Sequence, residues 1–443
     1  MNAVRGLALV AILLIGCAGG SHGPRSPGAA PSVVREPDGG ARDVQSLIAP
    51  MTERVVKARK LAMLRECPGR LASREELIRG VKSHVDRELP PDVLNHESRV
   101  LQLLGFVPVN FDYPAAIYAL LESELAGYYE PADGTMVLAA DLDGDNIDAT
   151  LAHELTHALQ DQHWDLKARS KYRPGESDKT AALLALAEGD ATSAMVDVLV
   201  HRTKPNSSAL LLADEMLIGQ IRASVDSGPT SSSPRILRAS LVAPYIEGLR
   251  FVNALRRRGG WSEVDRAWTT PLASTSQLLH VEKWLNHEEP IVVRVPEFKA
   301  LGGRFRSVNV DTEGELGIRI MFEEWMSMAR AREAATGWGG DRAVLVAHGD
   351  EYAFAMKVRY APGAKVAAAF NEVERGLTRK LGKPSEKRKG YWCIERPDRG
   401  PLAIAMRGAD IAIMAGPAST GEAWKSTGTC AKSRKWSAEI LAF

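Results

Sequence analysis

The chain has 443 residues, of which 45% are hydrophobic and 25% are charged, a composition that excludes an intrinsically disordered protein. Its length allows one large folded domain and a smaller one. Because 56 Lys and Arg residues nearly cancel 55 Asp and Glu residues, the formal net charge is only +1, and we expect no nucleic-acid partner.

The N-terminus has the pattern of a secretory signal. Arg5 precedes an apolar stretch, residues 6–15, that is too short to span a bilayer as a helix. The stretch ends in Leu14-Ile15-Gly16-Cys17, which resembles the lipobox of bacterial lipoproteins. The resemblance implies a lipoprotein signal over residues 1–17, with cleavage that leaves a lipid on Cys17. An ordinary signal peptide with an incidental cysteine is the alternative.

Residues 18–42 follow the signal and are rich in Gly, Pro and Ser without periodicity. This composition predicts a flexible tether between the lipid and a folded body. The two segments together predict an exported protein that is anchored to a membrane of the cell envelope.

The first part of the folded body is predicted to be helical, with one β-hairpin. Apolar residues recur at helical spacing from Val44 to about Phe106. A turn at residues 131–134 separates strand-like segments at 127–130 and 135–138, which predicts a hairpin. We expect the second strand to present a free edge on which an extended peptide can add as a further strand.

The remainder of the chain divides into a helical stretch and a mixed one, so the predicted fold class is α+β and mostly helical. Helices are predicted at residues 147–162, 178–201, 207–224, 240–258 and 314–335. From about residue 342 the pattern changes, and it predicts strands at 343–347, 352–360, 402–406 and 411–414 with a helix at 365–381.

Three cysteines remain besides Cys17, in a compartment that permits disulfides. Cys393 and Cys430 lie in the same C-terminal segment, and we expect them to pair. Cys67 is then left as a buried thiol in a helical region.

Residues 153–157 read His-Glu-Leu-Thr-His and fit the pattern H-E-x-x-H. Residues four apart share one face of a helix, so His153 and His157 can reach the same metal ion. Glu154 lies beside the two ligands rather than among them. There it can act as a general base for water that attacks a carbonyl group. A pair of ordinary histidines satisfied by hydrogen bonds is the alternative.

Zinc bound by two His residues needs a third protein ligand and an open position for water. Glu188 is the candidate, because it lies in a predicted helix that is otherwise apolar, and a buried carboxylate needs a partner. A Glu188 that faces solvent is the alternative. His163 stands at the offset of the third ligand of metzincins, but residues 158–162 contain no Gly to turn the chain. We therefore place His163 at the helix end.

An H-E-x-x-H helix followed by a helix with a Glu resembles the gluzincin peptidases, the group that includes thermolysin. Residues 152–163 and 188–191 also resemble a family of bacterial secreted or lipid-anchored zinc metallopeptidases, and this resemblance covers most of residues 75–345. It implies a zincin-like metallopeptidase domain over residues 43–345, with a small α+β domain over residues 346–443. Where thermolysin-like chains have an Asp four residues after the ligand Glu, this chain has Thr192.

Peptidases of this group also need a donor for the oxyanion of the tetrahedral intermediate, usually a His or Tyr from later in the chain. His280 is the first candidate and Tyr245 the second. The alternatives are that His280 merely follows a Ser/Thr run that caps a helix, and that Tyr245 is a buried aromatic residue.

The motif and the resemblance together predict a cell-envelope peptidase that holds one Zn²⁺ per chain and cleaves a peptide or protein substrate. A non-cutting binding or assembly lipoprotein with the same fold is the alternative, although a scaffold has no need of the base Glu154. A hydrolase acting on a non-peptide amide would use the same residues and stays open. The sequence defines neither the substrate specificity nor the membrane, and it leaves the oligomeric state open.

Overall fold

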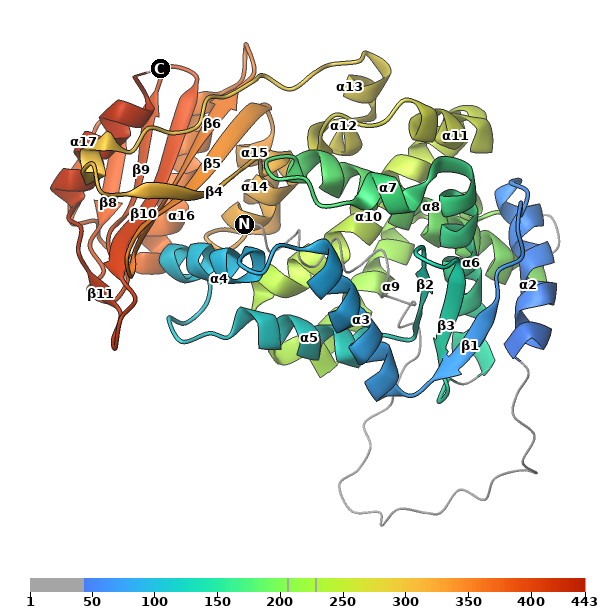
Figure 1. Cartoon of the computed structure of the whole chain (residues 1–443). Coiled ribbons are helices and arrows are strands. Elements are labelled where there is room, and N and C mark those ends of the chain that lie inside the picture. Colours follow the sequence, from blue (N-terminus) through green and yellow to red (C-terminus); the bar gives the residue numbers. More distant parts are fainter. Residues whose placement is uncertain (1–43, 143, 205–206, 228, 443) are drawn as a thin grey trace.

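The computed structural model describes residues 44–142, 144–204, 207–227 and 229–442. The chain is α+β and mostly helical: a helical body carries a three-stranded sheet, and an eight-stranded sheet forms the C-terminal part (Figure 1). The predicted lipidation site Cys17, the signal and the tether lie outside the described residues. Within the part of the chain that is described, no helix has the length and apolar character needed to cross a membrane.

Two long helices, α8 (Ser177–Thr203) and α10 (Arg235–Gly259), form the centre of the helical body. The helices around them are α2 (Val44–Arg59), α3 (Arg74–Glu88), α4 (Val93–Leu104), α5 (Tyr113–Glu124), α6 (Gly144–Trp164), α7 (Leu166–Ser170), α9 (Asp214–Ser227), α11 (Trp261–Thr269), α12 (Thr275–Leu279) and α13 (Val281–Leu285). Short 3-10 turns are η1 (Ala209–Leu211), η2 (Pro229–Ser232) and η3 (Lys299–Leu301). The helices predicted at 147–162, 178–201 and 240–258 correspond to α6, α8 and α10, whereas the one predicted at 207–224 is η1 followed by α9.

Local side-chain caps explain where several helices begin. Helix α3 starts with a capping box, in which the Ser73 hydroxyl accepts from the Glu76 N–H and the Glu76 carboxylate accepts from the Ser73 N–H. At the start of α5, Asp112 accepts from the Ala115 N–H and a proline occupies the first turn. Helix α4 ends at Leu104 and is capped by Gly105, whose φ of 84° favours glycine.

A three-stranded sheet lies beside α6 and consists of β1 (Gly69–Ala72), β2 (Gly127–Glu130) and β3 (Thr135–Ala139). The predicted hairpin is confirmed as β2 and β3. The predicted helical segment from Val44 to about Phe106 consists of α2, α3 and α4, but it also contains the unpredicted strand β1, which pairs in parallel with β3. The prediction that residues 135–138 present a free edge is also wrong, because β3 is the central strand and pairs with β1 and β2.

The C-terminal sheet is antiparallel, with the strand order β4-β5-β6-β10-β9-β8-β7 and the short β11 paired to β10. Its strands are β4 (Arg306–Asp311), β5 (Trp338–His348), β6 (Glu351–Tyr360), β7 (Glu386–Arg388), β8 (Tyr391–Ile394), β9 (Leu402–Arg407), β10 (Asp410–Ser419) and β11 (Lys425–Ser426). The expected domain boundary between residues 345 and 346 falls inside β5.

Helices cover both faces of this sheet: α14 (Gly314–Phe322), α15 (Met328–Ala335), α16 (Val366–Leu381) and α17 (Cys430–Ile440). Alternate residues of the strands face either a core shared with α4, α14, α15 and α16 or a second core shared with α17. The single helix predicted at 314–335 is wrong, since residues 323–327 separate α14 from α15. The predicted pair Cys393 and Cys430 is bonded, and Cys67 is a buried free thiol as predicted. The prediction that Cys67 lies in a helical region is wrong, because it lies in the loop between α2 and β1.

Two arginines of the C-terminal part cap helix α4 of the helical body. Arg396 donates from Nη2 to the Leu103 carbonyl at 2.6 Å and from Nη1 to the Leu104 carbonyl at 3.2 Å. Arg399 donates to the Gln102 and Val107 carbonyls. Burial lowers the pKa of Arg396 to about 9. These bonds satisfy the last carbonyls of α4 and join the two parts of the chain.

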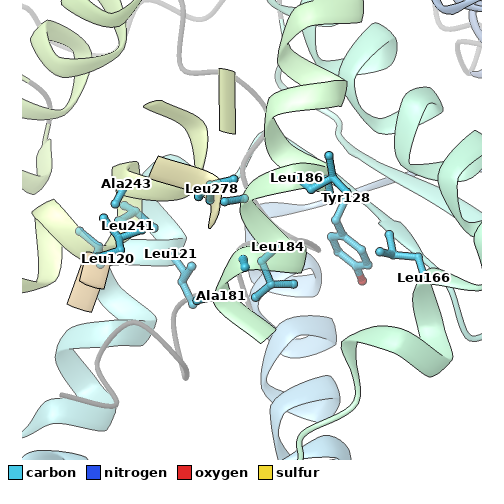
Figure 2. Close-up of a cluster of buried hydrophobic side chains, with 14 of the residues drawn as sticks. Leu120, Leu121, Tyr128, Leu166, Ala181, Leu184, Leu186, Leu241, Ala243 and Leu278 are labelled. Carbon is cyan, nitrogen blue, oxygen red and sulfur yellow. The ribbon is translucent and has the colours of Figure 1, made fainter. Parts of the chain in front are cut away.

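Helices α8 and α10 cross at two glycines. A Cβ atom on Gly248 would lie 1.8 Å from the Ala185 carbonyl oxygen, and one on Gly189 would lie 2.1 Å from the Gly248 carbonyl carbon. Only residues without a Cβ allow this approach. Around the same helices, side chains such as Leu184 on α8, Leu241 on α10 and Leu121 on α5 meet in one buried cluster (Figure 2). The crossing therefore fixes the part of α8 that carries Glu188.

Candidate metal centre

Helix α6 presents His153 and His157 on one face. Its other face packs Leu151, Leu155 and Leu159 into a buried apolar cluster, as the amphipathic pattern of the sequence predicts. The two imidazole rings meet edge to face with centroids 4.8 Å apart, and their Nε2 atoms are 3.1 Å apart. The helix therefore directs both Nε2 atoms at one point.

Glu188 reaches the same point from α8. Its Oε2 lies 3.0 Å from His153 Nε2 and 3.7 Å from His157 Nε2, and the three residues form one group of potential metal ligands. In a tetrahedral zinc site with bonds of 2.0–2.1 Å, ligand atoms are about 3.3 Å apart. Glu188 Oε1 and His153 Nδ1 are buried and have no hydrogen-bond partner. The spacing, the donor types and the unpaired Glu188 Oε1 fit a zinc ion, whereas His153 Nδ1 is on the side of its ring away from this point.

The electrostatics of the group show why it needs a positive charge. Burial opposes the charged form of His157, but the Glu188 and Glu154 carboxylates outweigh it and raise the pKa of His157 to about 9. Burial also opposes the charged form of Glu188, yet His157 and His153 together lower its pKa. Buried acceptors this close are stabilised only by a proton or a cation between them.

Glu154 lies beside the group and is anchored by the sheet. Its Oε2 accepts from the backbone N–H of Tyr129 on β2 at 2.9 Å. The Tyr129 hydroxyl in turn donates to Asp161 at 3.0 Å, which ties β2 to the end of α6. Burial raises the pKa of Glu154 to about 8. The carboxylate is therefore held next to the ligands and favours the proton-bearing form more than an exposed Glu does.

Gln160 supports the site, and the sequence reasoning missed it. Its Oε1 lies 2.8 Å from His157 Nδ1, and its Nε2 donates to the Ala187 carbonyl at 3.0 Å. Gln160 has no exposed surface. The only signal in the sequence is that a polar residue stands three positions after His157, on the same side of the predicted helix. That this side faces α8 is known only from the structure.

Asp190, two residues beyond Glu188, bonds to groups outside the metal-ligand group. Its carboxylate pairs with Arg59 of α2 and accepts from the indole N–H of Trp268. Asp190 therefore anchors α8 rather than orienting a His ligand.

The two predicted oxyanion donors lie in different places. The Tyr245 ring on α10 stacks on the His153 ring, with centroids 6.0 Å apart and an interplanar angle of 27°. His280, between α12 and α13, instead places its Nε2 2.7 Å from Glu315 Oε1. His163 contacts the Ala62 carbonyl near the end of α6, at 2.8 Å. The structure thus brings Tyr245 to the site and pairs His280 and His163 with other groups.

The site is closed. His153 and Glu188 have no exposed surface, and Glu154 and His157 each expose 1%. The four side chains are therefore out of reach of solvent in this structure.

Residues 303–423 match a family model described as "Domain of unknown function (DUF8575)". The match runs from just before β4 to just after β10 and includes none of the residues of the candidate metal centre. No curated protein and no solved structure matches the chain. The similarity thus concerns the C-terminal sheet and does not include the metal centre.

Proposed function

We propose that this chain is a zinc-dependent peptidase. The observation that carries the proposal is the convergence of His153 Nε2, His157 Nε2 and Glu188 Oε2 to within 3.0–3.7 Å of one another, with the Glu154 carboxylate beside them. Two His and one Glu are an established ligand set of catalytic zinc. The resemblance to gluzincin peptidases supports the same activity.

Each residue of the site has a role in this proposal. His153, His157 and Glu188 would hold the ion, which supplies Lewis acidity and activates water for attack on a carbonyl. Glu154, anchored through Oε2 by the Tyr129 N–H, takes the proton of the attacking water and later passes it to the leaving amine. Tyr245, stacked on His153, is the candidate donor to the oxyanion.

A second function is favoured by the closure of the site. A catalytic site must admit its substrate, and the four residues here expose only 0–1% of their surface. This burial supports a binding or assembly protein of the cell envelope that does not cut. The retained Glu154 supports the peptidase instead, because a protein that does not cut has no use for a base.

Metal analysis and peptide hydrolysis separate the two functions. We expect about one zinc per chain in the parent protein and much less in Glu188→Ala, because the variant loses a ligand. In Glu154→Gln we expect the zinc to remain while peptide cleavage is lost. Zinc that stays bound without any hydrolysis in the parent would favour the binding protein. A folded, metal-supplied parent without zinc would contradict the peptidase and leave the binding or assembly protein as the better account.

The location in the cell envelope is a separate part of the proposal and rests on residues 1–42. Labelling of the expressed chain with a radioactive fatty acid tests it. We expect the label in the membrane fraction of the parent and none in Cys17→Ser. Label that persists in Cys17→Ser would contradict the assignment of the anchor.

A further inference from the structure

Gln160 joins the two helices that carry the metal ligands. It lies on α6, three residues after His157, and its amide faces α8. Through Oε1 it contacts the ring of His157 at 2.8 Å, and through Nε2 it donates to the backbone carbonyl of Ala187 at 3.0 Å. Ala187 immediately precedes Glu188. One buried side chain therefore touches the second His ligand and the backbone next to the Glu ligand.

The Ala187 carbonyl determines which way the Gln160 amide points. A carbonyl only accepts hydrogen bonds, so it must face the NH₂ group of the amide, and a flipped amide would set two acceptors against each other. With the NH₂ group toward Ala187, the amide oxygen faces His157 Nδ1. An amide oxygen also only accepts, so Nδ1 of His157 must carry the proton.

A proton on Nδ1 leaves the Nε2 lone pair of a neutral His157 free. Nε2 is the atom that lies 3.1 Å from His153 Nε2 and 3.7 Å from Glu188 Oε2. The backbone of α8 thus dictates, through Gln160, the tautomer and the ring orientation of a ligand on α6. His153 differs, because its Nδ1 is buried and has no hydrogen-bond partner.

We propose that Gln160 is the positioning residue of the metal centre: it selects the Nδ1–H tautomer of His157 and holds its ring in register with Glu188. The inference rests on the proposed metal-binding function. Groups that hold the outer nitrogen of a ligating His typically strengthen metal binding by 10- to 100-fold. Gln160 acts on the metal through His157 and not by direct contact.

Gln162 is a matched control on the same helix. Its amide also bonds to backbone groups, accepting from the N–H groups of Leu64 and Arg65 and donating to the Arg65 carbonyl. It touches no metal ligand. Substitution of Gln162 therefore removes hydrogen bonds between a side-chain amide and the backbone, as substitution of Gln160 does, but it does not affect the tautomer of His157.

The test measures the zinc dissociation constant of the full chain by competition with a chromophoric chelator. Gln160→Met removes both polar atoms at similar volume, and we expect zinc to bind about 10- to 100-fold more weakly. Gln160→Glu keeps an acceptor for His157 Nδ1, so we expect it to recover part of that loss. We expect Gln162→Met to bind zinc within about 2-fold of the parent.

The absorption spectrum of the Co²⁺-loaded proteins adds a readout that a purely structural role would not change. We expect the d–d bands to shift in Gln160→Met and to stay unchanged in Gln162→Met. Gln160→Met and Gln160→Glu with the affinity and spectrum of the parent would overturn the positioning role and leave the metal site intact. A parent that binds neither zinc nor Co²⁺ would overturn the proposed metal site and this inference with it.

Discussion

Arg59 and Asp190 form a buried ion pair in which Arg59 Nε lies 2.6 Å from Asp190 Oδ1, and neither side chain has exposed surface. The indole N–H of Trp268 donates to the other oxygen of Asp190 at 2.9 Å, and the Arg59 guanidinium lies 4.4 Å from the centroid of the Trp261 ring. Because the pair joins α2 to α8 two residues beyond Glu188, it holds the helix that delivers the third ligand.

Removal of Asp190 should cost much more stability than removal of Asp265, the other partner of Arg59. Asp190→Ala leaves a buried guanidinium without its main partner, a change that costs about 3–5 kcal/mol. Asp265 has a side chain that is 38% exposed, so Asp265→Ala should cost no more than about 1 kcal/mol. Urea unfolding of both variants measures the difference, and equal losses would show that Asp190 is not the main anchor.

The crossing of α8 and α10 predicts that Gly248→Ala damages both stability and the metal centre. The added Cβ would lie 1.8 Å from the Ala185 carbonyl oxygen, so the helices must separate next to Glu188. We expect a loss of about 1–3 kcal/mol and a fall in bound zinc. Thermal unfolding and metal analysis are the measurements.

Gly219→Ala is the control for that variant. Gly219 also lies within a helix, α9, but a Cβ there would meet no atom within 4 Å. Alanine should therefore stabilise the protein by about 0.5–1 kcal/mol and leave the zinc content unchanged. If both alanines had the same effect, helix propensity would explain the result and the close crossing would not.

The elements that were predicted correctly are those whose signal is local. Helices α6, α8 and α10 have long apolar periodicities, and the hairpin of β2 and β3 has a turn between two strand-like segments. Strand β1 has four residues and pairs with β3, where Gly69 is opposite Met136. Such a short segment carries no periodicity of its own, and its partner lies far away in the sequence. For this reason the sequence pattern does not predict β1, and without β1 it wrongly predicts a free edge on β3.

The residues of the site also divide into those with a local signal in the sequence and those without one. His153, Glu154 and His157 are defined by spacing on one helix, and Glu188 by a carboxylate in an apolar helix. The group that anchors Glu154 is the backbone N–H of Tyr129, and every residue except proline has such a group, so no pattern marks it. Gln160 depends on a carbonyl of another helix. These supporting contacts exist only in the folded chain.

Asp178 predicts a pH dependence of stability between about pH 4 and pH 7. Burial, together with the nearby carboxylates of Glu315 and Glu313, raises the pKa of Asp178 to about 7. An acid whose pKa is higher in the folded state stabilises the fold below its unfolded pKa, near 3.9, and that contribution is lost as the pH rises through 7. We therefore expect the free energy of unfolding to fall over this range.

Asp178→Asn tests this assignment. The substitution keeps an oxygen that accepts from the N–H and hydroxyl of Thr275 but cannot ionise. The stability of the variant minus that of the parent should rise from pH 4 to pH 8, by an amount on the order of a few kcal/mol. Urea midpoints at several pH values measure it, with Asp226→Asn at an exposed carboxylate as the control. A pH profile parallel to that of the parent would contradict the assignment.

Tyr245 and His280 were both candidates for the oxyanion donor, and their surroundings now predict opposite results. Tyr245 stacks on the ligand His153, so Tyr245→Phe should keep the ring packing and the zinc while turnover falls by about 100- to 1000-fold. His280 bonds to Glu315, so His280→Ala should keep turnover and zinc and cost about 1 kcal/mol of stability. Peptide hydrolysis, zinc content and urea unfolding of the two variants decide between the candidates. Full turnover in Tyr245→Phe would show that Tyr245 is not the oxyanion donor. Lost turnover in a His280→Ala variant that still holds zinc would make His280 the donor. Neither result can come from a change in metal binding.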